Sequence, residues 1–217
     1  ALDEAEEEAI RSLPAEAALS RLCGHMGAVG KFTQVAALLE ARLRADLTPQ
    51  TAAACHEALR KAIGNGRGPK LTKLRPAYAS LFGAALARLE DFDDAQADDV
   101  AVWAFGAVSA LQLTKPLHPL SPESFEPAAL QVELLLRRLL DEKAAGRAGA
   151  GGTLREAIAG GALFGVLEAM HGMLRHEYTR ARACAALRLA VQLGGACFSK
   201  EQRAKLASWN SRAQNFS

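Results

Sequence analysis

The fold class is decided by residues 74–111, LRPAYASLFGAALARLEDFDDAQADDVAVWAFGAVSAL. Apolar residues recur at helical spacing on both sides of the acidic middle of this stretch. They are Leu81, Leu86 and Leu89 before it, and Val100, Trp103, Ala104 and Val108 after it. Asp93 and Gln96 have the spacing of a capping box, in which the two residues satisfy the free N–H groups of a helix start. The stretch therefore predicts a helix over 75–90, a tight capped turn, and a second helix over 94–112.

The same pattern extends outward in both directions. Helical runs alternate with short breaks rich in Gly, Pro or Asp, and the further runs are 3–11, 15–28, 31–45, 49–63, 122–144, 153–174, 177–193 and 200–212. The chain is 50% hydrophobic but only 6% aromatic, and its many alanines favour helix over strand. We expect an all-α fold of stacked antiparallel helix pairs, either a short α-solenoid or an irregular helical bundle.

Several helix starts share one chemistry, an apolar residue followed by a capping side chain and an acidic or amide residue. The starts are Leu47-Thr48-Pro49-Gln50, Phe92-Asp93 with Gln96, Leu120-Ser121-Pro122-Glu123, and Phe198-Ser199 with Gln202. Proline at the first helical position is favourable because its missing N–H has no partner there in any case. The similarity fits an irregular repeat, and it also fits the plain likeness of good helix starts in any all-α protein.

A Gly/Ala-rich segment at 146–152 suggests how the chain is organised. We interpret it as a linker, because it contains no GKS/T signature and follows no predicted strand. It separates a helical-repeat region, 1–145, from a C-terminal helical unit, 153–217.

Catalytic, metal and membrane functions find little support. The cysteines are isolated and the histidines scattered, so neither has metal-ligand spacing, and no nucleophile elbow is present. We therefore expect no enzyme activity, no cofactor and no metal. The apolar stretch 100–113 is too short to span a bilayer, and 157–174 is interrupted by Glu168 and His171, so no transmembrane helix is expected.

The charge is uneven although the net charge is only +2. We call residues 60–75 the basic connection, because it joins two predicted helices and carries Arg60, Lys61, Arg67, Lys70, Lys73 and Arg75 without an acid among them. Its centre, 64–69, is glycine-rich and predicts a flexible loop that could fold against a phosphate backbone or an acidic surface. The other interpretation is a solvated loop whose cations favour the end of the helix 49–63.

The C-terminal third is also basic, and Arg180 and Arg182 are its candidate contacts. Two basic regions favour contact with nucleic acid, whereas the scarcity of aromatic residues speaks against it, because single-stranded RNA is commonly held by base stacking.

The run Phe92-x3-Gln96-x2-Asp99-Val100-Ala101-x-Trp103-Ala104-Phe105, preceded by an Ala/Leu-rich helix, carries a resemblance. It resembles the paired-helix unit of octotricopeptide, heptatricopeptide and related RAP-associated repeat proteins. The resemblance covers 75–112, with fainter echoes at 48–63 and 177–193. It implies an organellar protein, mitochondrial or chloroplast, that binds organellar RNA or belongs to an organellar ribosome.

We therefore expect a non-catalytic helical-repeat binding or scaffold module that is RNA-associated, for example a peripheral subunit of an organellar ribosome. Its partners would be a larger protein or ribonucleoprotein assembly and the RNA phosphate backbone. The alternative is a protein-only accessory subunit of an organellar respiratory or photosynthetic complex. The chain begins at Ala1 without a methionine, so we expect an organellar presequence to have been removed or not included.

Overall fold

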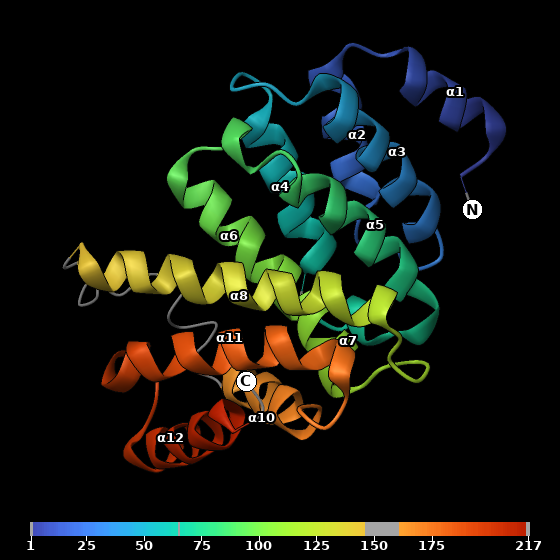
Figure 1. Cartoon of the computed structure of the whole chain (residues 1–217). Helices are drawn as coiled ribbons and strands as arrows, with labels where there is room; N and C mark the ends of the chain where they lie inside the picture. The colour runs from blue at the N-terminus through green and yellow to red at the C-terminus, as the bar shows by residue number, and fades with distance from the viewer. Residues whose placement is uncertain (1, 65, 146–160, 216–217) are drawn as a thin grey trace. The chain divides into compact units, whose positions relative to one another are not determined.

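The computed structural model describes residues 2–64, 66–145 and 161–215, and within these ranges it contains helices and no strand (Figure 1). The α-helices are α1 (Glu4–Ser12), α2 (Ala15–His25), α3 (Phe32–Asp46), α4 (Ala52–Ile63), α5 (Arg75–Leu86), α6 (Asp94–Ala104), α7 (Ala110–Thr114), α8 (Pro122–Ala144), α10 (Ala162–Gly172), α11 (Glu177–Leu193) and α12 (Lys200–Gln214). Short 3-10 turns are η1 (Gly68–Lys70), η2 (Thr72–Leu74), η3 (Leu89–Asp91) and η6 (Gly194–Ala196), and η4 (Phe105–Ser109) is a π-helix. The predicted all-α class is confirmed.

The chain divides into two compact units, Ala1–Val108 and Ser109–Ser217. This division differs from the predicted boundary, which placed α8 with the N-terminal helices. The reason is packing, because the most extensive helix contact of the second unit joins α8 to α11. The predicted linker at 146–152 lies outside the described residues.

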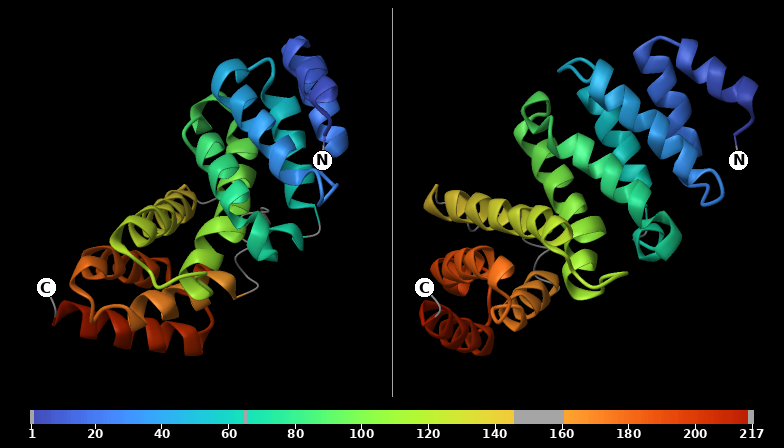
Figure 2. Two further views of the ribbon diagram at one scale, coloured as in Figure 1. Left: turned by 90° about the vertical axis from the view of Figure 1, so that its right-hand side faces the viewer. Right: turned by 45° about the vertical axis from the view of Figure 1, so that its right-hand side comes forward.

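The first unit is built from two layers of helices. The two most extensive contacts join helices that are two apart along the chain, since α3 packs on α5 and α2 packs on α4, and α4 also packs on α6 (Figure 2). Helix α1 is bonded to α3, since the backbone N–H of Leu2 and the carboxylate of Glu7 both bind Gln34, at 2.8 and 3.1 Å. One layer therefore contains α1, α3 and α5, and the other contains α2, α4 and α6.

Helices within one layer run parallel. Glu7, in the first half of α1, binds the start of α3, whereas Arg42 near the end of α3 binds the carbonyl of Ile10 near the end of α1. Consecutive helices reverse direction, so the unit is a stack of antiparallel pairs. This is the arrangement of a short α-solenoid, in which each pair buries its apolar face only against its neighbours.

Large side chains from both layers fill the core of the first unit. Phe32 of α3 stacks on Tyr78 of α5, with ring centroids 4.3 Å apart, and both are 2% exposed. Leu39, Leu81 and Phe82 are fully buried around them. Each such side chain stabilises the fold by roughly 1.5–3 kcal/mol, and the alanines between them let the helices approach closely.

The second unit repeats the parallel arrangement with α8 and α11. At their N-terminal ends the hydroxyl of Tyr178 donates to the carbonyl of Leu120 at 2.7 Å. At their C-terminal ends the ammonium of Lys143 donates to the carbonyls of Gln192 and Leu193, at 2.7 and 3.1 Å. Helix α12 packs on α11, and α10 packs on α7.

Helix starts follow the predicted capping chemistry. Asp93 accepts the N–H of Gln96 at 2.8 Å, and Ser199 and Gln202 form a reciprocal capping box. The predicted helix 49–63 instead begins at Ala52, because the hydroxyl of Thr51 accepts the N–H of Thr48 and donates to the carbonyl of Asp46, which holds residues 48–51 in a turn.

Further predicted helix extents differ in detail from the structure, and one is tested in part. The helix predicted over 75–90 ends at Leu86, where the chain turns through η3. The helix predicted over 94–112 contains the π-helix η4 between α6 and α7. Of the helix predicted over 153–174, residues up to 160 lie outside the described residues, and α10 covers the remainder to Gly172.

Candidate nucleic-acid interface

The basic connection joins α4 to α5 in the first unit. Arg60 and Lys61 lie in the last turn of α4, where a cation is favourable beside the helix C-terminus. Lys70 ends η1, Lys73 lies in η2, and Arg75 begins α5. The structure thus keeps the six predicted cations on one continuous segment, and no acidic residue occurs between Glu57 and Glu90.

Residues 66–74 of the connection are more ordered than the predicted flexible loop. Gly68–Lys70 and Thr72–Leu74 form consecutive 3-10 turns, and the side chains of Pro69 and Leu74 are buried. The backbone N–H of Gly66 donates to the carbonyl of Ile63 at 2.8 Å. These contacts hold residues 66–74 against the end of α4, so the exposed cations are carried by folded backbone.

Tyr78 joins the start of α5 to the end of α4. Its hydroxyl donates to the carbonyl of Ala62 at 2.7 Å, which satisfies an acceptor at the C-terminal end of α4. Burial raises the pKa of Tyr78 to about 12. Gly68 passes so close that a Cβ there would lie 2.2 Å from the tyrosine hydroxyl, so glycine is required for this approach.

The cations of the basic connection differ in whether they already have a partner within the chain. Arg60 makes two 2.7 Å bonds to Glu57, and this pairing lowers the pKa of Glu57. Arg67 and Arg75 also interact within the chain. By contrast, Lys61, Lys70 and Lys73 are exposed, and none of the described residues forms an ion pair with them. These three lysines are the cations most available to a partner.

Arg180 and Arg182 lie on α11 and therefore belong to the other unit. Arg182 binds two carboxylates of α8, Glu126 at 2.6 Å and Glu133 at 3.0 Å. The hydrogen bond from Arg137, together with Arg182, lowers the pKa of the largely buried Glu133. Arg180 donates to the carbonyl of Leu174 at 3.4 Å. Arg182 therefore joins α11 to α8 and is less available to a partner than the three lysines.

Two arginines with structural roles escaped the sequence analysis. Arg42 donates to the carbonyls of Ile10, Arg11 and Leu13 at the end of α1, and Arg88 donates to those of Arg44 and Leu47 at the end of α3. Each arginine is also paired with an aspartate a few residues later, Asp46 or Asp91. The shared Ala-Arg-Leu sequence at 41–43 and 87–89 was the signal available for this recurrence.

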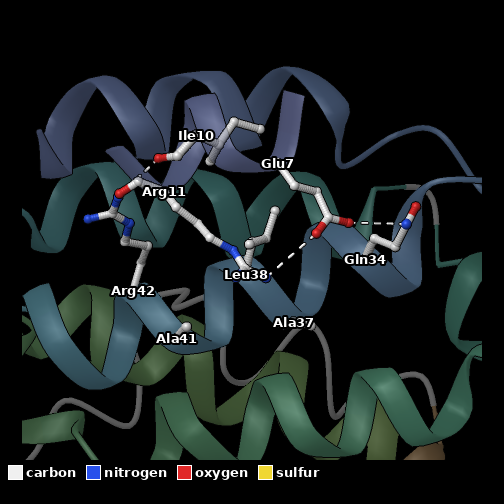
Figure 3. A pocket seen from close by; sticks show the side chains of 8 residues that line it. All are labelled: Glu7, Ile10, Arg11, Gln34, Ala37, Leu38, Ala41 and Arg42. Atoms are coloured by element: carbon white, nitrogen blue, oxygen red, sulfur yellow. Dashed lines mark hydrogen bonds and ion pairs between the residues drawn. The ribbon is translucent and has the colours of Figure 1, made fainter. Parts of the chain in front are cut away.

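A cavity of about 510 Å³ lies between α1 and α3 (Figure 3). Its lining residues are Glu7, Ile10, Arg11, Gln34, Ala37, Leu38, Ala41 and Arg42. The polar residues bind one another, since Glu7 pairs with Arg11 at 3.6 Å and accepts from Gln34 at 3.1 Å. The apolar part of the lining is formed by Ile10 of α1 and by Ala37, Leu38 and Ala41 of α3. Sequence analysis did not find this cavity, because it arises where α1 meets alanines of α3.

A further polar cluster joins α4 to α6. His56 of α4 binds Asp99 of α6 at 3.0 Å, and its ring lies 4.9 Å from that of Trp103. In the parts of the chain that the structure describes, no group of three or more His, Cys, Asp or Glu residues is placed to hold a metal ion. None of the described helices combines the length and apolar character needed to cross a membrane.

Comparison of the chain with models of protein families, with curated proteins and with solved structures finds no match. The candidate interface is therefore defined by this chain's own residues. Its most accessible part is the set of exposed lysines on the folded connection between α4 and α5.

Proposed function

We propose that the protein is a non-catalytic helical-repeat module that binds RNA phosphate through the basic connection. The observation that carries the proposal is the display of Lys61, Lys70 and Lys73 on a folded segment, in a stretch without acidic residues. Clustered cations attract a polyanion because each contact releases counterions from the nucleic acid. The order of the connection should also strengthen binding, because less conformational freedom is lost when RNA binds.

The cellular setting is part of the same proposal. The resemblance of residues 75–112 to organellar RNA-associated repeat units favours a mitochondrial or chloroplast protein. A stack of so few helix pairs is short for a protein that reads a long RNA alone, because such readers gain specificity by adding repeats. We therefore propose a subunit of a larger ribonucleoprotein assembly, for example a peripheral subunit of an organellar ribosome.

The proposal is tested by titrating the purified protein with single-stranded RNA at about 50 and about 200 mM salt, because phosphate contacts weaken steeply over this range. The variant K61Q/K70Q/K73Q is compared with K115Q/K200Q/K205Q, which removes the same charge from exposed lysines of the second unit. We expect the first variant to lose most of the binding and the second to retain it. Equal losses in both variants, or no binding by the intact protein at the lower salt, would contradict the proposal.

A protein-only accessory subunit of an organellar respiratory or photosynthetic complex is the second candidate. The cavity between α1 and α3 favours it, as does the use of Arg60 and Arg182 in ion pairs within the chain. Nuclease treatment of the native assembly separates the two candidates. Release of the protein by nuclease supports the RNA-associated function, whereas retention in an intact, RNA-free complex supports the accessory subunit.

A further inference from the structure

Nucleic acid offers a protein two kinds of contact, the phosphates and the bases. Phosphate contacts position a strand, whereas sequence is read by hydrogen bonds to base edges and by stacking of bases on aromatic rings. If the basic connection binds RNA, as proposed above, its side chains decide which of these contacts it makes.

Aromatic rings are poorly placed for stacking a base in the first unit. Tyr78 and Phe32 are each 2% exposed and stack on one another. Phe82 is fully buried and Phe92 is 7% exposed. The ring of Trp103 packs against His56, 4.9 Å away. These rings are therefore buried or packed on another ring within the fold.

Among the described residues of the second unit, Trp209 and Tyr178 are the rings to consider. Trp209 stacks on both Phe164 and His171, with centroids 5.3 and 5.0 Å apart. Tyr178 is 41% exposed, but its hydroxyl binds the carbonyl of Leu120 and its ring meets the edge of Phe125. Tyr178 is thus the ring to test for a stacking contribution.

The polar groups of the basic connection also favour phosphate over bases. A planar arginine fork reads the edge of guanine through two parallel bonds, but Nε and one Nη of Arg60 are already bound to Glu57, and Arg67 and Arg75 also interact within the chain. The exposed residues Lys61, Lys70 and Lys73 are compact charges whose donors rotate freely, so they recognise a phosphate without fixing a base.

We propose that this protein binds single-stranded nucleic acid through its phosphates and reads neither base sequence nor the ribose hydroxyl. The ligand class is a single-stranded polyanion, RNA or DNA, held by the three lysines. On a single strand each neutralised phosphate contributes about −0.7 to the slope of log K against log salt, so three contacts contribute about −2. Over a fourfold rise in salt this part of the affinity falls roughly 20-fold.

The experiment measures binding of equal-length oligomers of uridine, of adenosine and of mixed-sequence DNA at about 50, 100 and 200 mM salt. We expect affinities that agree within about twofold, and a salt slope that is shallower by about 2 in K61Q/K70Q/K73Q. A preference above about tenfold for one base or for RNA over DNA overturns this inference, as does an unchanged slope in the variant. Absence of binding to every oligomer overturns the proposed function as well, so the two failures are distinguishable.

A second pair of variants tests for hidden base stacking. Y178A removes the exposed ring, and Y178F keeps the ring but loses the hydroxyl bond to Leu120. We expect both variants to bind like the intact protein. A loss of about fivefold or more in Y178A but not in Y178F would overturn the inference, because that is the least that one stacked base contributes.

Discussion

Tyr78 shows at the scale of one residue how the candidate interface depends on buried chemistry. Its hydroxyl completes the end of α4, its ring packs on Phe32, and its position leaves room only for glycine at 68. The placement of the exposed lysines therefore depends on Tyr78, a residue that is itself only 2% exposed. A sequence motif of charges alone does not reveal this support.

Replacing Tyr78 by phenylalanine should lower the free energy of unfolding by about 1–3 kcal/mol, because the carbonyl of Ala62 loses its partner in a buried setting. Tyr178→Phe is a matched control, since its hydroxyl also donates to a carbonyl at 2.7 Å but at an exposed position. Urea unfolding of both variants provides the measurement. An effect of Y178F equal to that of Y78F would show that burial is not the cause.

The raised pKa of Tyr78 predicts a loss of stability at alkaline pH. The ordinary pKa is 10.0 and the folded value is about 12, so the stabilisation is fully present below pH 10 and is lost as the pH rises toward 12. The loss amounts to at most about 3 kcal/mol. Burial raises the pKa of Cys55 from 9.0 to about 12 as well, so its contribution is lost over an overlapping range that begins near pH 9.

Unfolding of the intact protein and of Tyr78→Phe should therefore be compared between pH 9 and 12. Phenylalanine does not titrate, whereas Cys55 is kept, so the variant should lose less stability over this range. Identical pH profiles would mean that Tyr78 titrates in the folded state as it does in the unfolded chain.

At the scale of elements, layers of parallel helices are joined by cations that reach the end of a neighbouring helix. Arg42 donates to a carbonyl at the end of α1, and Arg88 donates to one at the end of α3. In the second unit, Lys143 donates to a carbonyl at the end of α11. The last carbonyls of a helix have no partner within it and carry partial negative charge, so a cation is favourable there. This contact recurs in both units.

Replacing Arg42 by methionine should destabilise the first unit by about 1.5–3 kcal/mol, because three carbonyls at the end of α1 lose a charged donor. Arg44→Met is the control, since Arg44 forms an ion pair with Glu40 on the surface of the same helix and its side chain is 66% exposed. We expect that control to change stability by less than about 1 kcal/mol. Hydrogen exchange should show faster opening of α1 in R42M alone, and unchanged protection of α1 would refute the role given to Arg42.

Local signals explain why most helices were predictable. Caps such as Asp93 and Ser199 act within three residues, and apolar periodicity acts within one helix, so both can be read along the chain. The contacts of Arg42 with α1 join residues about thirty positions apart, and no local pattern predicts them. The same holds for Tyr78, whose phenol was visible in the sequence but whose acceptor was not.

For the whole molecule, the helical class could be predicted but the division into units could not. A Gly/Ala-rich segment at 146–152 is a reasonable linker signal, yet the units are defined by where helices pack, and α8 packs on α11. The candidate interface remains a prediction, but its parts differ in how far the sequence revealed them. Its charged residues could be identified in the sequence. The ion pairs that Arg60 and Arg182 form with carboxylates could be seen only in the structure.

The central claim is that nucleic acid binds at the basic connection, and a backbone-amide NMR titration with single-stranded RNA at about 50 mM salt tests it most directly. The account predicts that signals of residues 66–74 shift as RNA is added and return toward their free positions at about 200 mM salt, because phosphate contacts are screened. Shifts confined to α1 and α3, around their cavity, or no shifts anywhere would contradict it.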